Sequence, residues 1–435
     1  MSTTTEAFSR GAGTTDLPAE LREDKARQSF ARDFGAEAAL NLESCIRCGM
    51  CADACHYYIA TEDPKYTPIL KVEPFQQAYR RESGPFAVFY RLLRLKKKVT
   101  ADQLEQWQEL LFDSCNQCGR CSLICPMGID VAGLIEMGRR AMFEAGLAPA
   151  ELYERARHQA ETGQPEDSKD SYPEILAGIG REYNIDIPVD KDRAEVLVCA
   201  PRTDLEKHPA AIAALAKVLE KSGADYTFRS SALVAENYGY YAGSRDWQHK
   251  ISMRIIDQAK AIGAKMVLVP ECGHAYTALR WQAAELAGEE LPFKVRHATE
   301  YLAQQVAEGK LKLGKVNGES FAFHDPCQLV RKGGVLDAPR ALMQAMGVDL
   351  KEMPNKKGFS FCCAGGGGVN DLERARPLRY RAQEMKLREV DGTGASRFLT
   401  SCSDCRVAFN DAGEHFNWDK RPESLVELVA ANLKE

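Results

Sequence analysis

The chain lacks the features that mark several large classes of protein. No apolar run approaches the roughly eighteen residues that a membrane-spanning helix needs. The first sixteen residues have neither the charged and apolar parts of a secretory signal nor a twin arginine. No Gly-x-Gly-x-x-Gly follows a predicted strand, and no Gly-Lys-Ser/Thr follows the glycine run at 365–368, which argues against nicotinamide, flavin and phosphate-loop sites. A net charge of −5 without a basic domain argues against nucleic acid as a partner.

Cysteine, by contrast, is abundant. The chain has 15 cysteines in 435 residues, and 45% of its residues are hydrophobic, enough for two or three domains with real cores. So many cysteines without a secretory signal are typical of metal ligation in a reducing compartment. We therefore expect a cytoplasmic protein, or a peripheral one on the cytoplasmic face of a membrane through a partner protein.

Eight of the cysteines form two runs of identical spacing, C-x2-C-x2-C-x3-C. The runs are Cys45, Cys48, Cys51 and Cys55, and then Cys115, Cys118, Cys121 and Cys125. This is the bacterial ferredoxin pattern for 4Fe-4S cubes, in which the fourth cysteine ligates the other cluster. We therefore expect one cube on Cys45, Cys48, Cys51 and Cys125, and the other on Cys115, Cys118, Cys121 and Cys55. Proline follows Cys125, whereas His56 follows Cys55. Disulfides and zinc are weaker interpretations, because zinc sites favour paired C-x2-C units.

The apolar pattern changes along the chain. Residues 17 to about 150 have helical spacing, with helices predicted at Leu17–Arg32, Val88–Lys98, Ala101–Phe112 and Val131–Ala145. Residues 160–192 hold glycine, proline, serine and acidic residues, a composition typical of a linker. The predicted parts are 1–35 (flexible tail and leading helix), 36–150 (helical dicluster domain), 151–194 (linker), 195–318 (degenerate cysteine-rich module) and 319–435 (cysteine-rich module).

From residue 195 onward, short β-rich runs alternate with amphipathic stretches, which predicts an α/β arrangement with mostly parallel sheets. The predicted strands are Val196–Ala200, Tyr226–Phe228, Met266–Pro270, Phe321–His324 and Phe398–Thr400. The predicted helices are His208–Ser222, Trp247–Ile262, Ala275–Ala287, Ala298–Glu308, Arg340–Met346, Leu372–Arg388, Cys402–Ala412 and Glu423–Leu433. The pattern of this region indicates a tandem repeat whose first copy is degenerate.

Only the second copy keeps a full set of cysteines: Cys327, Cys362, Cys363, Cys402 and Cys405. Adjacent cysteines on a strand point to opposite faces, so the backbone must bend sharply for both to reach one metal centre, and we expect the glycine run at 365–368 to allow that bend. Cys402 and Cys405 stand where a helix begins, and a helix N-terminus favours thiolate. Zinc and buried free cysteines are the alternatives. The first copy retains Cys199 and Cys272, for which core packing is the favoured role, and His274 is a weaker candidate ligand.

Two ferredoxin-type runs followed by Cys, Cys-Cys and Cys-x2-Cys resemble the heterodisulfide reductase catalytic-subunit superfamily. The likeness is to its D-subunit type and is closest to the K subunit of the dissimilatory sulfite reductase-linked membrane complex and its paralogues. Glu271-Cys272-Gly273-His274 and the segment from Cys125 to Asp130 add to it. The resemblance implies that the five cysteines hold a non-cubane 4Fe-4S cluster that acts on a disulfide. Ala364 departs from the glycine that commonly follows the cysteine pair.

The predicted function is an electron relay through two cubane clusters to a non-cubane centre that reduces or forms a disulfide. The predicted partners are a membrane quinone-reactive subunit or a flavoprotein, together with a thiol or disulfide substrate or a small sulfur carrier protein. Two alternatives stay open. One is an electron-transfer subunit of a flavin-linked lactate, glycolate or glycerol-3-phosphate dehydrogenase, and the other is a redox-sensing module without turnover.

One further segment, residues 86–98, is both apolar and basic. Amphipathicity favours an ordinary surface helix with its aromatic side chains in the core. An acidic membrane surface or a partner is the alternative occupant.

Overall fold

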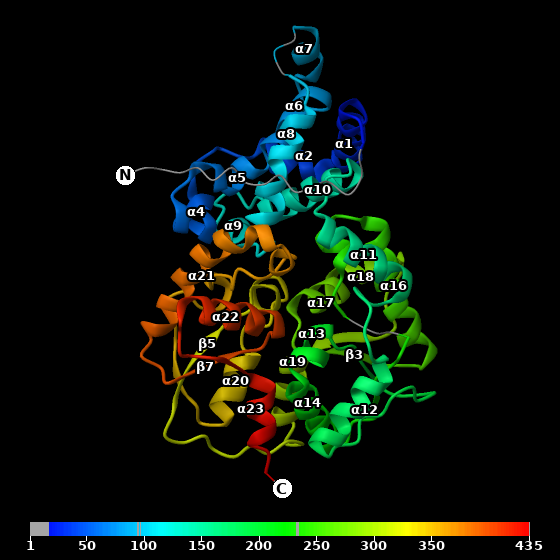
Figure 1. Cartoon of the computed structure of the whole chain (residues 1–435), viewed down its shortest axis with the longest axis vertical. Helices are drawn as coiled ribbons and strands as arrows, with labels where there is room; N and C mark the ends of the chain where they lie inside the picture. The colour runs from blue at the N-terminus through cyan, green and yellow to red at the C-terminus, as the bar shows by residue number, and fades with distance from the viewer. Residues whose placement is uncertain (1–16, 94, 96, 232–234, 435) are drawn as a thin grey trace. The chain divides into compact units, whose positions relative to one another are not determined.

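The structure is a computed structural model that describes residues 17–93, 95, 97–231 and 235–434. The chain divides into two compact units. The first unit comprises Met1–Glu154, Tyr240–Arg245 and Gly367–Ala382, and the second comprises Arg155–Gly239, Asp246–Gly366 and Gln383–Glu435. The tail predicted at residues 1–16 lies outside the described residues. Figure 1 shows the helices and strands in chain order.

The first unit is helical, as the sequence predicts. Its α-helices are α1 (Ala19–Asp33), α2 (Ala36–Glu43), α3 (Met50–Ala54), α4 (His56–Thr61), α5 (Pro68–Lys71), α6 (Glu73–Glu82), α7 (Ala87–Leu92), α8 (Ala101–Gln108), α9 (Arg120–Leu123) and α10 (Val131–Glu144). Rings of Phe30, Phe75 and Trp107 from α1, α6 and α8 pack together at the centre, and the ring of Phe30 lies 5.2 Å from that of Phe75 and 5.9 Å from that of Trp107 between centroids. Aromatic rings in such tilted contacts add to the stability that apolar burial provides.

A buried arginine ties the three chain segments of this unit together. Arg139 on α10 donates hydrogen bonds to the carbonyls of Leu111, Cys115, Tyr241 and Gly367, at 2.8 to 3.0 Å. Its guanidinium also lies 4.8 Å from the ring of Phe112. A charge fully removed from water is tolerated only when its donors are satisfied, and four carbonyls satisfy this one.

The second unit contains two parallel sheets with the same strand order. The first has the order β2-β1-β3-β4 and the second β6-β5-β7-β8. The strands are β1 (Val196–Val198), β2 (Tyr226–Thr227), β3 (Met266–Val269), β4 (Lys294–His297), β5 (Ser320–His324), β6 (Asp349–Lys351), β7 (Arg397–Thr400) and β8 (Pro422–Ser424). The predicted fold class, a helical domain followed by α/β cysteine-rich modules with parallel sheets, is confirmed.

Helices flank these sheets. They are α12 (Tyr172–Tyr183), α13 (Arg202–Lys207), α14 (Pro209–Lys221), α16 (Arg245–Ala261), α17 (Gly273–Thr277), α18 (Ala283–Ala287), α19 (Ala298–Ala307), α20 (Ala338–Ala345), α21 (Arg376–Asp391), α22 (Ser403–Phe416) and α23 (Leu425–Ala431). Two more, α11 (Ala150–Thr162) and α15 (Tyr238–Ala242), have residues in both units, as α16 and α21 also do. One hydrophobic cluster contains residues of both sheets, including Val198 of β1 and Phe323 of β5, so the two repeats share a core.

Two expectations need correction. The stretch 160–192 is not plain linker, because α12 lies in it and buries Tyr172, Leu176 and Ile179 in the shared core. The helix predicted at Val88–Lys98 ends at Leu92, and Arg94 and Lys96 lie outside the described residues. Its aromatic residues are not in the core: Phe86 and Phe89 are each 61% exposed.

Candidate metal centres

The two ferredoxin-type runs share one backbone conformation. Arg47 and Gln117, each two residues after the first cysteine of its run, have left-handed φ angles of 54°. Gly49 and Gly119 follow the second cysteine and are also left-handed, with φ of 83° and 74°. Each glycine precedes a short helix, α3 or α9. Only glycine takes this conformation at no steric cost, so the repeated glycine lets each loop curl around a common centre.

The fourth cysteine of each run lies with the other run. Cys125 lines one small pocket together with the first three cysteines of the first run, Cys45, Cys48 and Cys51. Burial raises the pKa of Cys121 well above its ordinary value, and the negative charges of Cys118, Cys115 and Cys55 raise it further. Cys55 lies near the second run, because the Nζ of Lys71 is 3.9 Å from the Sγ of Cys55 and contacts the carbonyl of Ser114, the residue before Cys115. Two groups of four soft thiolate donors fit 4Fe-4S cubes.

Sequence reasoning missed a buried lysine beside the second group. Lys71 is 1% exposed, and its Nζ lies 3.9 Å from the Sγ of Cys55 and contacts the carbonyl of Ser114. An ammonium group that donates to a ligating sulfur stabilises negative charge there. His56, which replaces the usual proline, begins α4, and its Nε2 lies 2.9 Å from Oδ1 of Asn116 in the second run. Neither of these contacts can be predicted from the spacing of the cysteines alone.

The five remaining candidate cysteines converge at the second sheet. Cys327 follows β5, and Cys402 and Cys405 follow β7, the strand paired with β5. Carboxyl ends of neighbouring parallel strands meet at one edge, so these thiols are brought together by topology. Cys362 and Cys363 come from the loop after β6, and the Sγ atoms of Cys327 and Cys362 are 3.6 Å apart. All five are buried, with exposed fractions of 1 to 5%.

The sharp bend beside the cysteine pair begins earlier than the sequence suggests. Ala364, directly after Cys363, has a left-handed φ of 62°, and Gly367 and Gly368 follow with 66° and 83°. A methyl group makes this conformation strained, and the fold nevertheless holds Ala364 in it. Because of this bend, the side chains of Cys362 and Cys363 do not point to opposite faces as they would on a strand. Both can therefore approach one centre.

Electrostatics single out one of these sulfurs. Hydrogen bonds from the thiols of Cys362 and Cys405 lower the pKa of Cys363 to about 6. The hydrogen bond with Cys362 and burial raise the pKa of Cys327. The hydrogen bonds from Cys362 and Cys405 favour the thiolate of Cys363, the form that binds metal.

A histidine that the sequence analysis did not assign belongs to this cluster. A ring nitrogen of His324 and the sulfurs of Cys363 and Cys405 all lie within 4.8 Å of one another. His324 ends β5 and is fully buried, and neither ring nitrogen has a hydrogen-bond partner among the residues that the structure describes. Burial lowers the pKa of His324 well below its usual value, so the ring is neutral. The sequence signal was available in His324-Asp325-Pro326-Cys327.

The degenerate copy carries carboxyl groups in place of a thiol cluster. Cys199 and Cys272 are both fully buried, and the sulfur of Cys272 accepts a hydrogen bond from the amide of Ala275, which stands where the second copy has Cys405. Burial raises the pKa of Glu236 to about 8 and that of Glu271 to about 7. His274 is buried on α17. A core role fits both cysteines.

This copy also contacts the loop that carries the second copy's cysteines. The amide of Ser403 donates to the carbonyl of Glu271 at 2.8 Å, and the hydroxyl of Ser403 donates to the same carbonyl at 3.1 Å. Because Ser403 stands between Cys402 and Cys405, the degenerate copy supports the geometry of the N-terminal end of α22.

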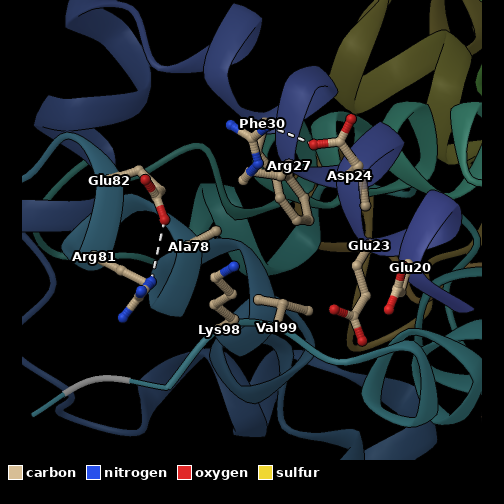
Figure 2. Close-up of a pocket in the computed structure, with 11 residues that line it drawn as sticks. Glu20, Glu23, Asp24, Arg27, Phe30, Ala78, Arg81, Glu82, Lys98 and Val99 are labelled. Carbon is tan, nitrogen blue, oxygen red and sulfur yellow. Dashed lines mark hydrogen bonds and ion pairs between the residues drawn. The ribbon is translucent and has the colours of Figure 1, made fainter. Parts of the chain in front are cut away.

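Figure 2 shows a separate pocket of about 360 Å³ in the first unit, between α1, α6 and residues 98–99. It contains no cysteine. Four of its charged groups form two ion pairs, Arg27 with Asp24 at 2.5 Å and Arg81 with Glu82 at 3.2 Å. We assign the pocket no role.

Comparisons with known proteins agree with the two kinds of centre. Residues 41–129 match the 4Fe-4S dicluster domain, and residues 321–410 match the cysteine-rich domain. The dicluster match implies two cubane clusters, and the cysteine-rich match points to a further iron–sulfur centre.

The chain is also similar to known proteins over most of its length. The chain is 27% identical to the D subunit of the dihydromethanophenazine:CoB--CoM heterodisulfide reductase of Methanosarcina mazei, over 92% of this chain and 96% of that protein. It is 25% identical to the second iron–sulfur subunit of the Hdr-like menaquinol oxidoreductase of Archaeoglobus fulgidus, over 91% and 80%. It is 28% identical to the EtfAB:quinone oxidoreductase of Syntrophomonas wolfei, over 82% of this chain and 52% of that protein. Within the described part of the chain, no helix has the length and apolarity to cross a bilayer.

Proposed function

We propose that the chain is an iron–sulfur oxidoreductase of the heterodisulfide reductase D-subunit type, and that it relays electrons to a site that reduces or forms a disulfide. The observation that carries this proposal is the gathering of five buried cysteines at the carboxyl ends of β5 and β7. When bound, the clusters supply one-electron transfer and, at the five-cysteine centre, an iron with an open position for sulfur. The closer kinship to the K subunit of the sulfite reductase-linked complex is part of the proposal.

The assignment of ligands follows the groups described above. Cys45, Cys48, Cys51 and Cys125 hold one cube, and Cys115, Cys118, Cys121 and Cys55 hold the other. Cys327, Cys362, Cys363, Cys402 and Cys405 hold the non-cubane cluster. Five donors exceed the four that a cube takes.

The balanced reaction is RS–SR′ + 2 e⁻ + 2 H⁺ → RSH + R′SH, which also runs in reverse. The S–S bond breaks, both sulfurs are reduced, and each takes one proton. The chain's own residues keep water from the site through burial and place positive charge near two of its cysteines. The positive charges of Arg331 and Lys332 favour the thiolate of Cys327, and buried Lys386 interacts electrostatically with Cys362. Such groups stabilise the negative charge that develops when sulfur is reduced.

The partners proposed are a membrane quinone-reactive subunit or a flavoprotein, and a small disulfide or a sulfur carrier protein as substrate. In this scheme the chain lies on the cytoplasmic face of the membrane through its partner. The names of the relatives, which include a heterodisulfide reductase component and a menaquinol oxidoreductase component, support such an assembly.

A second candidate function is electron transfer between a flavoprotein and a quinone without disulfide chemistry. It is favoured by the likeness to the EtfAB:quinone oxidoreductase, of which the chain spans about half the length. A redox-sensing module without turnover is the third interpretation, and sustained multiple turnover by the isolated protein would contradict it.

The test is the Cys363→Ser variant, assayed for reoxidation of dithionite-reduced protein by the CoB–CoM heterodisulfide and by oxidised dithiothreitol. We expect disulfide-dependent turnover to fall to background while the EPR signals of the cubes remain. Cys199→Ser, another buried cysteine but in the degenerate copy, should keep full turnover. Undiminished turnover in Cys363→Ser would end the assignment. Reduction by an electron-transfer flavoprotein, with no response to either disulfide, would favour the second candidate.

A further inference from the structure

One helix turns its apolar face outward. The large apolar side chains of this region are Phe86, Val88, Phe89, Leu92, Leu93 and Leu95, with exposed fractions from 58 to 76%. At about 100° per residue, Val88, Phe89 and Leu92 lie within an arc of about 100° on α7. Ala87, on the other side, is the residue that the helix buries. A helix on the surface of a water-soluble protein buries its apolar face and exposes its polar face. The exposed apolar face of α7 therefore indicates an apolar partner.

The same segment is locally basic in an acidic protein. Residues 86–98 contain five lysines and arginines and no acidic residue, whereas the whole chain has a net charge of −5. Among the described residues of the segment, Arg91, Lys97 and Lys98 are exposed. The side chain of Gln77 on α6 donates to the carbonyls of Lys97 and Lys98 at 3.1 and 3.2 Å, which holds the basic end beside α6. In Figure 1, α7 lies beyond the end of α6, clear of the other helices of its unit.

We propose that the α7 segment, residues 86–98, docks on the surface of an anionic lipid bilayer. Phe89 and Leu92 enter the boundary between headgroups and acyl chains, and the side chains of Arg91, Lys97 and Lys98 stay at the level of the lipid phosphates. The negative charge of the lipids complements a segment that has basic residues and no acidic residue. An apolar protein partner would not require these basic residues. This inference stands apart from the disulfide chemistry, because it concerns attachment alone.

The test is flotation of the full-length protein with vesicles. We expect binding to vesicles of phosphatidylcholine with phosphatidylglycerol, weaker binding to phosphatidylcholine alone, and loss of binding as salt rises. The double variant Phe89→Ser/Leu92→Ser should not float. The control Leu40→Ser/Phe359→Ser removes two other exposed apolar side chains, 69% and 56% exposed, and should float like the wild type.

Three outcomes would overturn the docking proposal. The first is wild-type protein that stays with the unbound fraction at low salt, and the second is a double variant that floats equally well. The third is a wild-type dimer in solution that becomes monomeric in the double variant, since α7 would then be covered by a second copy.

A second inference concerns His324 and rests on the proposed assignment of the five cysteines to an iron–sulfur cluster. His324 is fully buried, has two unpartnered ring nitrogens among the described residues, and lies within 4.8 Å of the sulfurs of Cys363 and Cys405. Its ring packs edge-on against Phe409 at 4.9 Å between centroids, and the hydroxyl of Thr400 donates to its carbonyl at 3.2 Å. These contacts fix the ring and leave its nitrogens for the centre.

We infer that His324 donates an N–H hydrogen bond to sulfur of this centre and thereby raises its reduction potential. A donor stabilises the more negative, reduced state, and hydrogen bonds to sulfur are one of the means by which proteins set cluster potentials. His324 is thus a positioning and tuning residue that binds no substrate.

The test compares His324→Leu and His324→Gln by EPR-monitored redox titration and iron analysis. We expect the potential of the five-cysteine centre to become more negative in the leucine variant, with a smaller change in the glutamine variant, which keeps a donor. His297→Gln, at the buried histidine of the first sheet, should leave the potential unchanged.

An unchanged potential in an iron-loaded leucine variant would overturn the hydrogen bond. Loss of this centre's iron with the cube signals intact would overturn it in favour of direct ligation. Wild-type protein without iron at this centre would instead contradict the proposed function, so the two failures are distinguishable.

Discussion

At the scale of single residues, the degenerate copy keeps acids where water cannot reach them. The carboxyl of Glu236 accepts hydrogen bonds from the amides of Arg202 and Thr203 at 3.0 and 3.4 Å. These bonds favour the ionised form, but burial and the charge of Asp404 outweigh them, and the pKa of Glu236 rises from 4.5 to about 8. The copy that has only two cysteines thus contains buried ionisable carboxyl groups.

This residue predicts a pH dependence of stability. A carboxyl with a raised pKa binds its proton more tightly in the folded protein. Its contribution is therefore complete below about 4.5, the ordinary pKa, and is lost as pH rises to about 8. We expect Glu236→Gln to be more stable than the wild type near pH 8, by on the order of a few kcal/mol, and to show a shallower decline.

Thermal unfolding of both proteins under anaerobic conditions from pH 5 to 8.5 measures this difference. Exposed Glu414 provides the control, because Glu414→Gln should leave the pH profile unchanged. Parallel profiles of the wild type and Glu236→Gln would contradict the raised pKa.

At the scale of elements, three of the four edge strands escaped the sequence analysis, and only the edge strand β2 was predicted, as Tyr226–Phe228. The central strands β1, β3, β5 and β7 were predicted from apolar runs, but β4, β6 and β8 were not. All three lie at sheet edges and contain charged residues, as in Lys294, Asp349 and Glu423. An edge strand is solvated along one side, so its residues need not be apolar, and only pairing with a neighbour defines it.

The stretch that contains α12 was predicted to be a linker, because the polar residues around the helix in the sequence concealed its buried face. Leu176 on α12 is 0% exposed and belongs to the core shared by the two sheets. We expect Leu176→Ala to lower the free energy of unfolding by about 2–5 kcal/mol, the range for a leucine side chain deleted from a core. Guanidinium unfolding is the measurement, and Leu40→Ala, at a 69% exposed position, is the control. Equal losses for both variants would restore the interpretation of this stretch as a linker.

At the scale of the whole molecule, three proposed clusters predict a metal stoichiometry. Anaerobically purified protein should contain about twelve iron and about twelve acid-labile sulfide per chain. A variant that disrupts only the five-cysteine centre should keep about eight of each, since the cubes depend on other residues. Cys363→Ser tests this by elemental analysis alongside its activity assay. Colourless protein with bound zinc would contradict the proposal.

The sequence by itself determined which residues are candidate ligands and in which groups, because the spacing of cysteines within a short loop is a local property of the chain. It also indicated the helical first part and the repeated α/β second part, because apolar periodicity reports which elements bury a face. Tertiary structure alone decided that His324 and Lys71 lie beside cysteines distant in sequence, and that α7 faces outward. Such placements depend on how strand ends and helices pack, and no spacing along the chain records that packing.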